Sequence, residues 1–437
     1  MGSVQVPPVL LIAEAANPEW VSVPLIGWSL ARSIARLYPA HLATQVRNRE
    51  AIVRAGLTEG RDFTAIDSEA FAAPLYRLGD ALRGGKGVGW TTISAVQTFS
   101  YYYFEHLVWK QFGDRIRRGD FALVHRITPV SPTMPSILAK RCARAGIPFV
   151  LGPLNGGVAW PKEFQAARRK EREWLSYARG LYKWLPGYTS SLESSAAIVA
   201  GSRSTLGEIP ERFRDKCIYL PENAIDPERF SSAAAPAPDG PLRACFVGRL
   251  VPYKGPDMLI EAVAPLLQSG HLSLDIIGDG PLMPALRELV QKHQLESRVT
   301  LHGWIAHEAL QPLMRASQLF LFPSIREFGG GVVLEAMALG IVPVVIDYAG
   351  PGELVTDSVG YRVPLADRPT LVERFRQVVT GICADPVKLQ DKSAACRTRV
   401  RDLFTWDAKA RQILAVYEWA QRRQGTKPEF FLESAVS

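Results

Sequence analysis

The chain has 437 residues, which is more than one hydrophobic core usually supports, so its length predicts two domains. With 47% hydrophobic and 22% charged residues, its composition is that of a folded globular protein, and no segment reaches the roughly 20 apolar residues of a membrane-spanning helix. Lysine and arginine exceed aspartate and glutamate by eight, which favours anionic partners such as nucleotide phosphates or acidic lipid headgroups.

The first half of the chain has the pattern of an α/β domain. Residues 9–13 form an apolar run that predicts a buried strand, 14–25 a long loop, and 26–37 a helix whose apolar side chains recur at helical spacing. Further short strands are expected near 43–46, 63–66, 122–127, 148–151 and 197–200. The loop after the first strand lacks G-x-G-x-x-G, so NAD binding has little support.

Two features follow strands in this half. His125 lies near the end of the strand predicted at 122–127, and strand ends in α/β folds point into ligand crevices. A lone histidine can equally be structural, and the sequence leaves both roles open. A glycine-rich loop over 152–157 follows the next strand and could face the glycine-rich stretch 323–340 across a cleft.

Aromatic side chains gather in two segments of the first half, 101–109 and 166–184, and the second also carries several lysines and arginines. A basic helix with aromatic residues can lie on an anionic membrane surface. The alternative is a solvated helix whose aromatic residues pack inward.

The second half begins after a Pro/Ala-rich loop at 231–241. Strands are expected at 242–248, 272–277, 299–301, 319–322 and 342–346, with helices at 256–268 and 282–294. This alternation predicts a parallel, doubly wound sheet.

Two cations follow the first strand of this half. Arg249 and Lys254 are five residues apart in a loop bounded by Gly248 and Gly255, where a guanidinium and an ammonium suit a diphosphate. Gly278 and Gly280 lie in the turn that follows the next strand, and taken alone they are weak evidence for a ligand site.

The most informative stretch is 323–340. It follows a strand, contains the triple glycine 329–331, and continues as a helical pattern that begins at Val332 and is closed by Gly340. Such a strand–loop–helix junction offers backbone N–H groups to an anion. Glu327 and Glu335 could accept hydrogen bonds from hydroxyl groups, so the stretch suits a nucleotide sugar. An ordinary glycine-rich loop is the alternative.

These motifs resemble those of the retaining glycosyltransferases of family 4, which have the GT-B fold. The resemblance rests on Gly248-Arg-Leu with Lys254-Gly255, on Gly278-Asp-Gly-Pro, and on the two glutamates Glu327 and Glu335 at the family's spacing; Pro221 to Asp226 and Phe404 to Asp407 resemble two further segments. The loop after the first strand departs from the family, with Glu14-Ala-Ala-Asn17 in place of a Gly-Gly pair.

The resemblance implies two Rossmann-like domains facing a central cleft. Residues 1–198 would bind the acceptor and 199–407 the donor, with a C-terminal helix at 408–425 packing back on the first domain. Arg249 and Lys254 would hold the donor diphosphate, Glu335 the ribose, and Glu327 the transferred sugar, while His125 would lie near the reacting carbon. The remaining expected donor-site residues are Gly248, Gly278, Gly280, Phe328, Gly329, Gly330 and Val332.

The implied activity is sugar transfer from a nucleotide-diphosphate sugar to a glycan or lipid-linked acceptor, with retention of configuration, in polysaccharide or glycoconjugate synthesis. The chain contains no Asp-x-Asp, so neither a metal nor another cofactor is expected. The alternatives are a non-catalytic nucleotide-sugar-binding subunit and a GT-B sugar phosphorylase.

Five scattered cysteines without a Cys-x-x-Cys pair, and no signal-peptide pattern, indicate a cytoplasmic protein that could associate with the inner face of a membrane. A nucleic-acid partner has only the positive charge in its favour. No motif determines the sugar, the base of the donor, the acceptor, the linkage or the oligomeric state.

Overall fold

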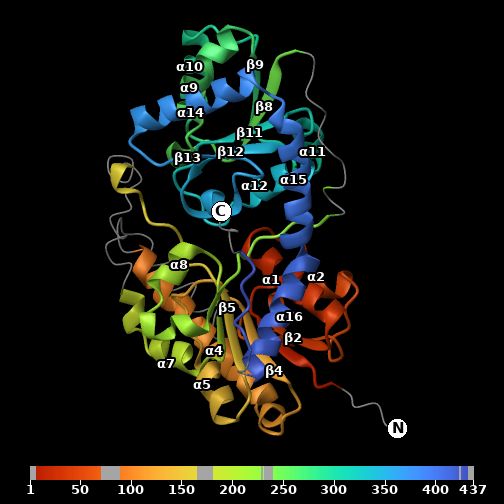
Figure 1. The fold of residues 1–437 in the computed structure, drawn as a ribbon. Helices are drawn as coiled ribbons and strands as arrows, with labels where there is room; N and C mark the ends of the chain where they lie inside the picture. Colours follow the sequence, from red (N-terminus) through yellow and green to blue (C-terminus); the bar gives the residue numbers. More distant parts are fainter. Residues whose placement is uncertain are drawn as a thin grey trace. The chain divides into compact units, whose positions relative to one another are not determined.

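The structure is a computed structural model that describes residues 6–69, 89–164, 181–227, 230, 240–422 and 425–431 (Figure 1). It divides into two compact units. The described residues of Met1–Gly157, Leu175–Glu222 and Lys409–Ser437 form unit 1, and those of Val158–Trp174 and Asn223–Ala408 form unit 2.

Unit 1 is built on a parallel sheet of seven strands among the described residues, in the order β3-β2-β1-β4-β5-β6-β7. β1 pairs with both β2 and β4, so the direction of winding reverses between β1 and β4. The strands are β1 Val9–Ala13, β2 Ala40–Gln45, β3 Phe63–Ile66, β4 Leu123–Thr128, β5 Phe149–Leu154, β6 Ala197–Ala200 and β7 Cys217–Tyr219.

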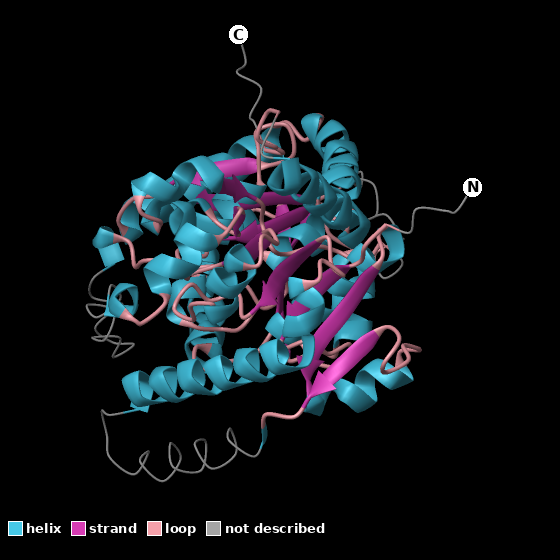
Figure 2. Cartoon of the chain, turned by 90° about the horizontal axis from the view of Figure 1, so that it is seen from below, coloured by secondary structure: helices cyan, strands magenta, loops and turns pink. Residues whose placement is uncertain are grey.

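Helices accompany the strands of unit 1, as expected for crossovers between parallel strands (Figure 2). The described helices are α1 Val23–Leu37, η1 Val46–Asn48, α2 Arg49–Arg54, α4 Gly89–Arg117, α5 Ile137–Arg144, η4 Leu181–Trp184, α7 Tyr188–Ser194, α8 Arg203–Glu208 and η5 Glu211–Lys216. The last helix, α16 Trp406–Arg422, belongs to this unit from Lys409 onward.

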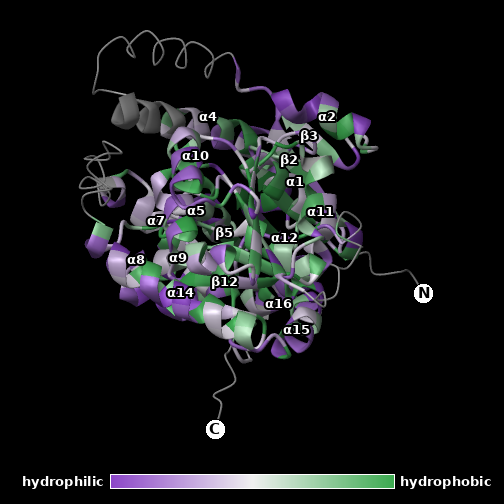
Figure 3. Ribbon diagram, turned by 90° about the horizontal axis from the view of Figure 1, so that it is seen from above, coloured by the Kyte–Doolittle hydropathy of each residue, from purple (hydrophilic) through white to green (hydrophobic). Residues whose placement is uncertain are grey.

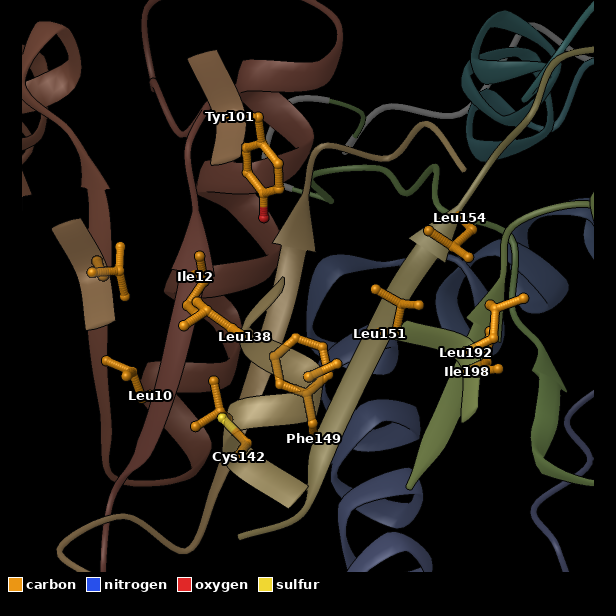
Figure 4. Close-up of a cluster of buried hydrophobic side chains, with 14 of the residues drawn as sticks. Leu10, Ile12, Tyr101, Leu138, Cys142, Phe149, Leu151, Leu154, Leu192 and Ile198 are labelled. Carbon is orange, nitrogen blue, oxygen red and sulfur yellow. The ribbon is translucent and has the colours of Figure 1, made fainter. Parts of the chain in front are cut away.

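The core of unit 1 lies between the sheet and α4, α5 and α7. Alternate residues of β1, Leu10 and Ile12, face this core, and β5 contributes Phe149 and Leu151 (Figure 4). All five residues of β1 are buried, because helices cover both faces of a parallel sheet.

Unit 2 is built on a six-stranded parallel sheet among its described residues, in the order β10-β9-β8-β11-β12-β13. The strands are β8 Leu242–Val247, β9 Leu272–Ile277, β10 Val299–Gly303, β11 Leu319–Phe322, β12 Val342–Asp347 and β13 Tyr361–Pro364. β8 to β10 extend in one direction and β11 to β13 in the other, so the winding reverses between β8 and β11.

The helices of unit 2 are η2 Lys162–Phe164, η6 Pro252–Lys254, α9 Pro256–Gln268, α10 Met283–Lys292, α11 His307–Met314, α12 Gly331–Leu339, α13 Ala349–Leu354, α14 Arg368–Ala384 and α15 Lys388–Leu403. α14 packs on α9, and its ribbon in Figure 3 has largely the colour of hydrophilic residues. α12 has buried side chains around most of its circumference and lies between β12, α13 and α15.

The predicted doubly wound α/β architecture is confirmed in both units. The expected boundary at residue 198 differs from the division in the structure, because it falls inside β6. β6 is followed by β7, which adds a further strand to the sheet of unit 1, and the division lies between Glu222 and Asn223. The sequence patterns missed the short strands β7 and β13, and they placed the start of α1 three residues late, at 26 instead of Val23.

Within the described residues, no helix is long and apolar enough to cross a membrane. Of the aromatic-rich segments, 101–109 lies in α4, where Tyr101, Phe104 and Val108 are buried in the core of unit 1. Most of 166–184 lies outside the described residues, and its last residues form η4, where Trp184 is 87% exposed.

Candidate active site

The candidate site lies at the carboxyl ends of β8 and β11. In a doubly wound sheet, ligands bind where the winding reverses, because the loops after the two neighbouring strands diverge and leave a crevice between them. In unit 2 those loops are 248–255 and 323–330, which carry Arg249, Lys254 and Glu327. The structure therefore brings the two most informative sequence motifs to one edge of one sheet.

The glycines after β8 and β9 allow two loops to pack backbone to backbone. A Cβ atom on Gly278 would lie 2.0 Å from the carbonyl oxygen of Gly248, and one on Gly280 would lie 2.5 Å from that of Leu250. The amide of Leu250 donates to the carbonyl of Asp279 at 2.9 Å. Gly278 and Gly280 thus support the loop that carries the cations.

Lys254 and Glu327 form an ion pair in which both side chains are largely buried, with 15% and 18% of the side chain exposed. The Lys254 ammonium also lies 5.0 Å from the centre of the Phe322 ring. Burial lowers the pKa of Lys254 to about 8. The pair links the loop after β8 to the loop after β11.

The other two charged candidates are Arg249 and Glu335. Arg249 is exposed in the loop after β8. Glu335 is half-buried in the second turn of α12 and already makes a polar interaction within the protein.

The helix α12 begins at Gly331, directly after the loop that carries Glu327. Its N-cap, Gly330, has a left-handed backbone with φ of 61°, which favours glycine. The first N–H groups of any helix lack partners within the helix and attract anions. Gly329 and Gly330 lead into that end, Val332 is half-buried in the first turn, and Phe328 is 44% exposed.

His125 belongs to unit 1 and is completely buried. Its Nε2 lies 2.6 Å from the carbonyl oxygen of Gly152, which can only accept, so Nε2 donates and Nδ1 accepts from the Tyr417 hydroxyl at 2.5 Å. Burial lowers the pKa of His125 to about 4, so the ring is neutral at pH 7. With both ring nitrogens occupied inside the core, this geometry argues against a role at the reacting carbon and favours the structural alternative.

Sequence reasoning overlooked four residues at this site: Trp160, Tyr253, Arg326 and Tyr348. Trp160 comes from the first half of the chain, yet it belongs to unit 2 and packs on Tyr253 and Arg326. The sequence marks the glycine loop 152–157, but nothing in it predicts that the next three residues contact the loops after β8, β11 and β12.

Across the part of the chain that the structure describes, no cluster of three or more His, Cys, Asp or Glu side chains is arranged to hold a metal ion.

Comparison with known proteins matches the described site to a family. The sequence model of the family described as "Glycosyl transferases group 1" matches residues 228–391, which span the loops of the candidate site. Over these residues the chain is similar to the group 1 glycosyltransferases. It therefore has the enzyme class and the GT-B architecture that its motifs predict.

Curated relatives agree with this assignment. The chain is 27% identical over 308 residues to WcaL of Salmonella typhimurium, a protein assigned as a colanic acid biosynthesis glycosyltransferase, covering 64% of this glycosyltransferase and 74% of WcaL. It is 29% identical over 235 residues to glycogen synthase of Mycobacterium tuberculosis, covering 53% of this chain and 56% of that protein. The second alignment thus spans about half the length of the relative.

Solved structures share the fold over nearly the whole chain. Sucrose-phosphate synthase from Thermosynechococcus elongatus superposes with a TM-score of 0.59 at 16% identity, over 95% of this chain and 100% of that one. HepE of Anabaena, solved in complex with UDP, superposes with a TM-score of 0.57 at 15% identity, over 94% and 99%. At these identities the likeness establishes the fold alone.

Proposed function

We propose that this glycosyltransferase moves a sugar from a nucleoside-diphosphate sugar to a glycan or lipid-linked acceptor with retention of the anomeric configuration. The observation that carries the proposal is the Lys254–Glu327 pair at the winding reversal of unit 2, beside the N-terminus of α12. A cation and a helix N-terminus suit a diphosphate, and a carboxylate suits sugar hydroxyls.

In this proposal each charged residue has a defined task. Breaking the sugar–phosphate bond places negative charge on the departing diphosphate, which Arg249, Lys254 and the N–H groups at 328–330 stabilise. Glu327 accepts hydrogen bonds from the transferred sugar, and Glu335 accepts them from the ribose. In the buried pair the Glu327 carboxylate neutralises the Lys254 ammonium. Phosphate oxygens of the donor can neutralise the same ammonium, so they can take the place of Glu327.

The proposed reaction needs no metal. Many sugar transferases hold the diphosphate through a metal bound by carboxylates. Here Arg249 and Lys254 neutralise the diphosphate instead, and the sequence contains no Asp-x-Asp. Retention follows from the resemblance to family 4, and transfer on the same face of the sugar as the leaving group is the implied route.

The relatives support a role in polysaccharide or glycoconjugate synthesis, since the names of WcaL and glycogen synthase both refer to glycan assembly. HepE binds UDP, which makes a uridine donor the first to test.

The deciding experiment is a thermal-shift screen of the full chain with UDP-, GDP- and ADP-glucose, followed by a transfer assay with the radiolabelled donor that binds. A donor at a hundredfold excess over its dissociation constant should stabilise the protein by about 2.7 kcal/mol. If none of the three shifts the melting temperature, the donor assignment is wrong. Binding without transfer or hydrolysis would favour a non-catalytic subunit, and phosphate-dependent glycan breakdown would favour a phosphorylase.

Association with the inner face of a membrane is a further part of the proposal. It is supported by the excess of eight basic residues and by the exposed Trp184 of η4. Sedimentation with phosphatidylglycerol vesicles should be strong at low salt and lost at high salt, because surface charges are screened. Equal sedimentation with neutral phosphatidylcholine vesicles would contradict the electrostatic attraction.

A further inference from the structure

The residues just after the glycine loop 152–157 form a short segment, 158–164, that we call the strap. The strap belongs to unit 2, although the residues before it belong to unit 1. The residues just before the strap are held within unit 1 by hydrogen bonds from Asn155 to Glu222 at 2.6 Å and from the Gly156 amide to Thr205 at 2.8 Å.

Trp160 is the centre of the strap and is 8% exposed. The guanidinium carbon of Arg326 lies 5.2 Å from the centre of the Trp160 ring and 5.7 Å from that of Phe328. The Trp160 ring also meets the Tyr253 ring edge to face, with centres 6.2 Å apart and planes at 89°. Trp160 thus contacts one residue of the loop after β8 and one of the loop after β11.

The strap backbone makes two more contacts with the same edge of the sheet. The carbonyl of Val158 accepts from Arg326 Nε at 3.4 Å, and that of Ala159 accepts from the Tyr348 hydroxyl at 2.9 Å. Tyr348 directly follows β12, so the strap is tied to the loops after three neighbouring strands, β8, β11 and β12.

These contacts lie immediately beside the proposed donor residues. Tyr253 precedes Lys254, while Arg326 and Phe328 enclose Glu327 in the sequence. The two loops are also joined directly, because the Ile325 amide donates to the Tyr253 carbonyl at 2.9 Å. Movement of Tyr253 or Arg326 would therefore displace Lys254 or Glu327.

We propose that Trp160 is a positioning residue for the donor site: through Tyr253 and Arg326 it holds the loops after β8 and β11 at the separation at which Lys254 and Glu327 receive the donor. This inference rests on the proposed function for its donor. It adds to that function a residue from the first half of the chain, and it assigns Arg326 as a link between Trp160 and Glu327.

The first test needs no ligand. Hydrogen–deuterium exchange of the full chain is compared among the wild type, W160A, W160F and the control Y361A. Tyr361 makes a similar contact in the same unit, with Lys392 Nζ 4.8 Å from its ring, but it stands at the first residue of β13, at the amino edge of the sheet. In W160A the amides of 251–255 and 324–330 should exchange roughly tenfold faster, as expected when a local contact is lost.

W160F keeps a ring for Arg326 and Tyr253 and should restore most of the protection, whereas Y361A should leave both loops unchanged. Unchanged exchange of these loops in W160A would overturn the positioning role, whichever donor the enzyme uses.

The second test uses inorganic pyrophosphate as a probe that depends on neither base nor sugar. W160A should weaken its binding by about tenfold, the loss expected for one desolvated cation–π contact. R326A should have a similar effect, and the double variant should be little worse than either single one, because the two residues act through the same contact. Y361A should bind as the wild type does.

The outcomes separate the two proposals. Wild-type protein that binds neither pyrophosphate nor a nucleotide sugar would contradict the proposed function, while the exchange data would still decide the role of Trp160. Wild-type binding with equal affinity in W160A, or fully additive effects of W160A and R326A, would overturn the positioning role alone.

Discussion

Lys254 is the residue whose chemistry the structure defines most sharply. Burial beneath the site lowers its pKa to about 8, so its charge changes within the pH range in which the enzyme can be assayed. The ammonium form binds phosphate and the neutral amine does not. Donor affinity should therefore be present below pH 8 and decline above it.

We predict that the KM for the donor rises above pH 8, by up to about tenfold per pH unit, since one proton is linked to binding. Stability without donor should change in the opposite direction. Between about pH 8 and the ordinary lysine value of 10.5, the unfolded chain binds more protons, so the folded state gains stability as the pH rises. In K254R, whose guanidinium stays charged, both effects should vanish. A wild-type KM that is flat from pH 7 to 10 would contradict the assignment of Lys254.

His125 illustrates the opposite case, in which a predicted catalytic residue proves to be buried. Its neutral ring links β4, β5 and α16 through Gly152 and Tyr417. The pKa of His125 is about 4 in the folded state and 6.5 in the unfolded chain. As the pH falls below 6.5, the unfolded chain therefore takes up a proton at His125 before the folded protein does. This residue's contribution to stability, about 3 kcal/mol, is therefore present above pH 6.5 and lost as the pH falls towards 4.

We predict that H125Q removes this acid-sensitive part of the unfolding free energy, measured by urea denaturation between pH 4 and 7. Turnover of the folded variant should stay within about tenfold of the wild type, whereas loss of a general acid or base would cost about 10²- to 10⁴-fold. The control is Y417F, measured in the same way, because this variant keeps the imidazole of His125. A loss of turnover of 10³-fold in stably folded H125Q would restore the catalytic interpretation.

At the scale of elements, the site depends on how closely the loops after parallel strands can approach. Gly278 brings the loop after β9 into contact with the loop after β8, and its φ of 140° is one that other residues rarely adopt. Helix α12 is likewise bounded by left-handed glycines, Gly330 at its start and Gly340 at its end. The site is thus built by elements whose ends require glycine.

We predict that G278A destabilises the protein by roughly 3 kcal/mol and weakens donor binding, because the new Cβ would displace the carbonyl of Gly248 and with it the loop to Lys254. G303A is the matched control: its φ of 71° is also positive, but a Cβ there meets nothing within 4 Å. It should cost about 1 kcal/mol and leave donor affinity unchanged. Equal losses in both variants, by denaturation and thermal shift, would show that strain alone matters.

At the scale of the whole molecule, our proposal has the protein's own cations, Arg249 and Lys254, balance the charge of the donor. We predict undiminished turnover in EDTA, measured with the donor identified by the thermal-shift screen. Recovery of activity on adding Mg²⁺ or Mn²⁺ to an EDTA-inactivated enzyme would overturn the metal-independent proposal.

In R249M the rate of sugar transfer should fall by about 10²-fold or more, since one phosphate ligand is lost from the transition state.

The sequence by itself determined the alternating α/β pattern, the motifs of the loops 248–255 and 323–330, and the enzyme class. These depend on local signals: apolar runs of strand length, glycines where the chain turns, and charged residues at fixed spacing. They located Lys254 and Glu327 in separate loops and matched them to a diphosphate and a sugar, but they could not show that the two side chains form a buried pair.

Only the tertiary structure decided the rest. His125 bonds to Tyr417, which is 292 positions away, and Trp160 packs on Arg326. The short strand β7 joins the sheet of unit 1 by pairing with β6, which no periodicity in its three residues reveals. In each case the physical reason is the same: burial and partner choice are set by residues distant in sequence, and a local pattern contains no information about them.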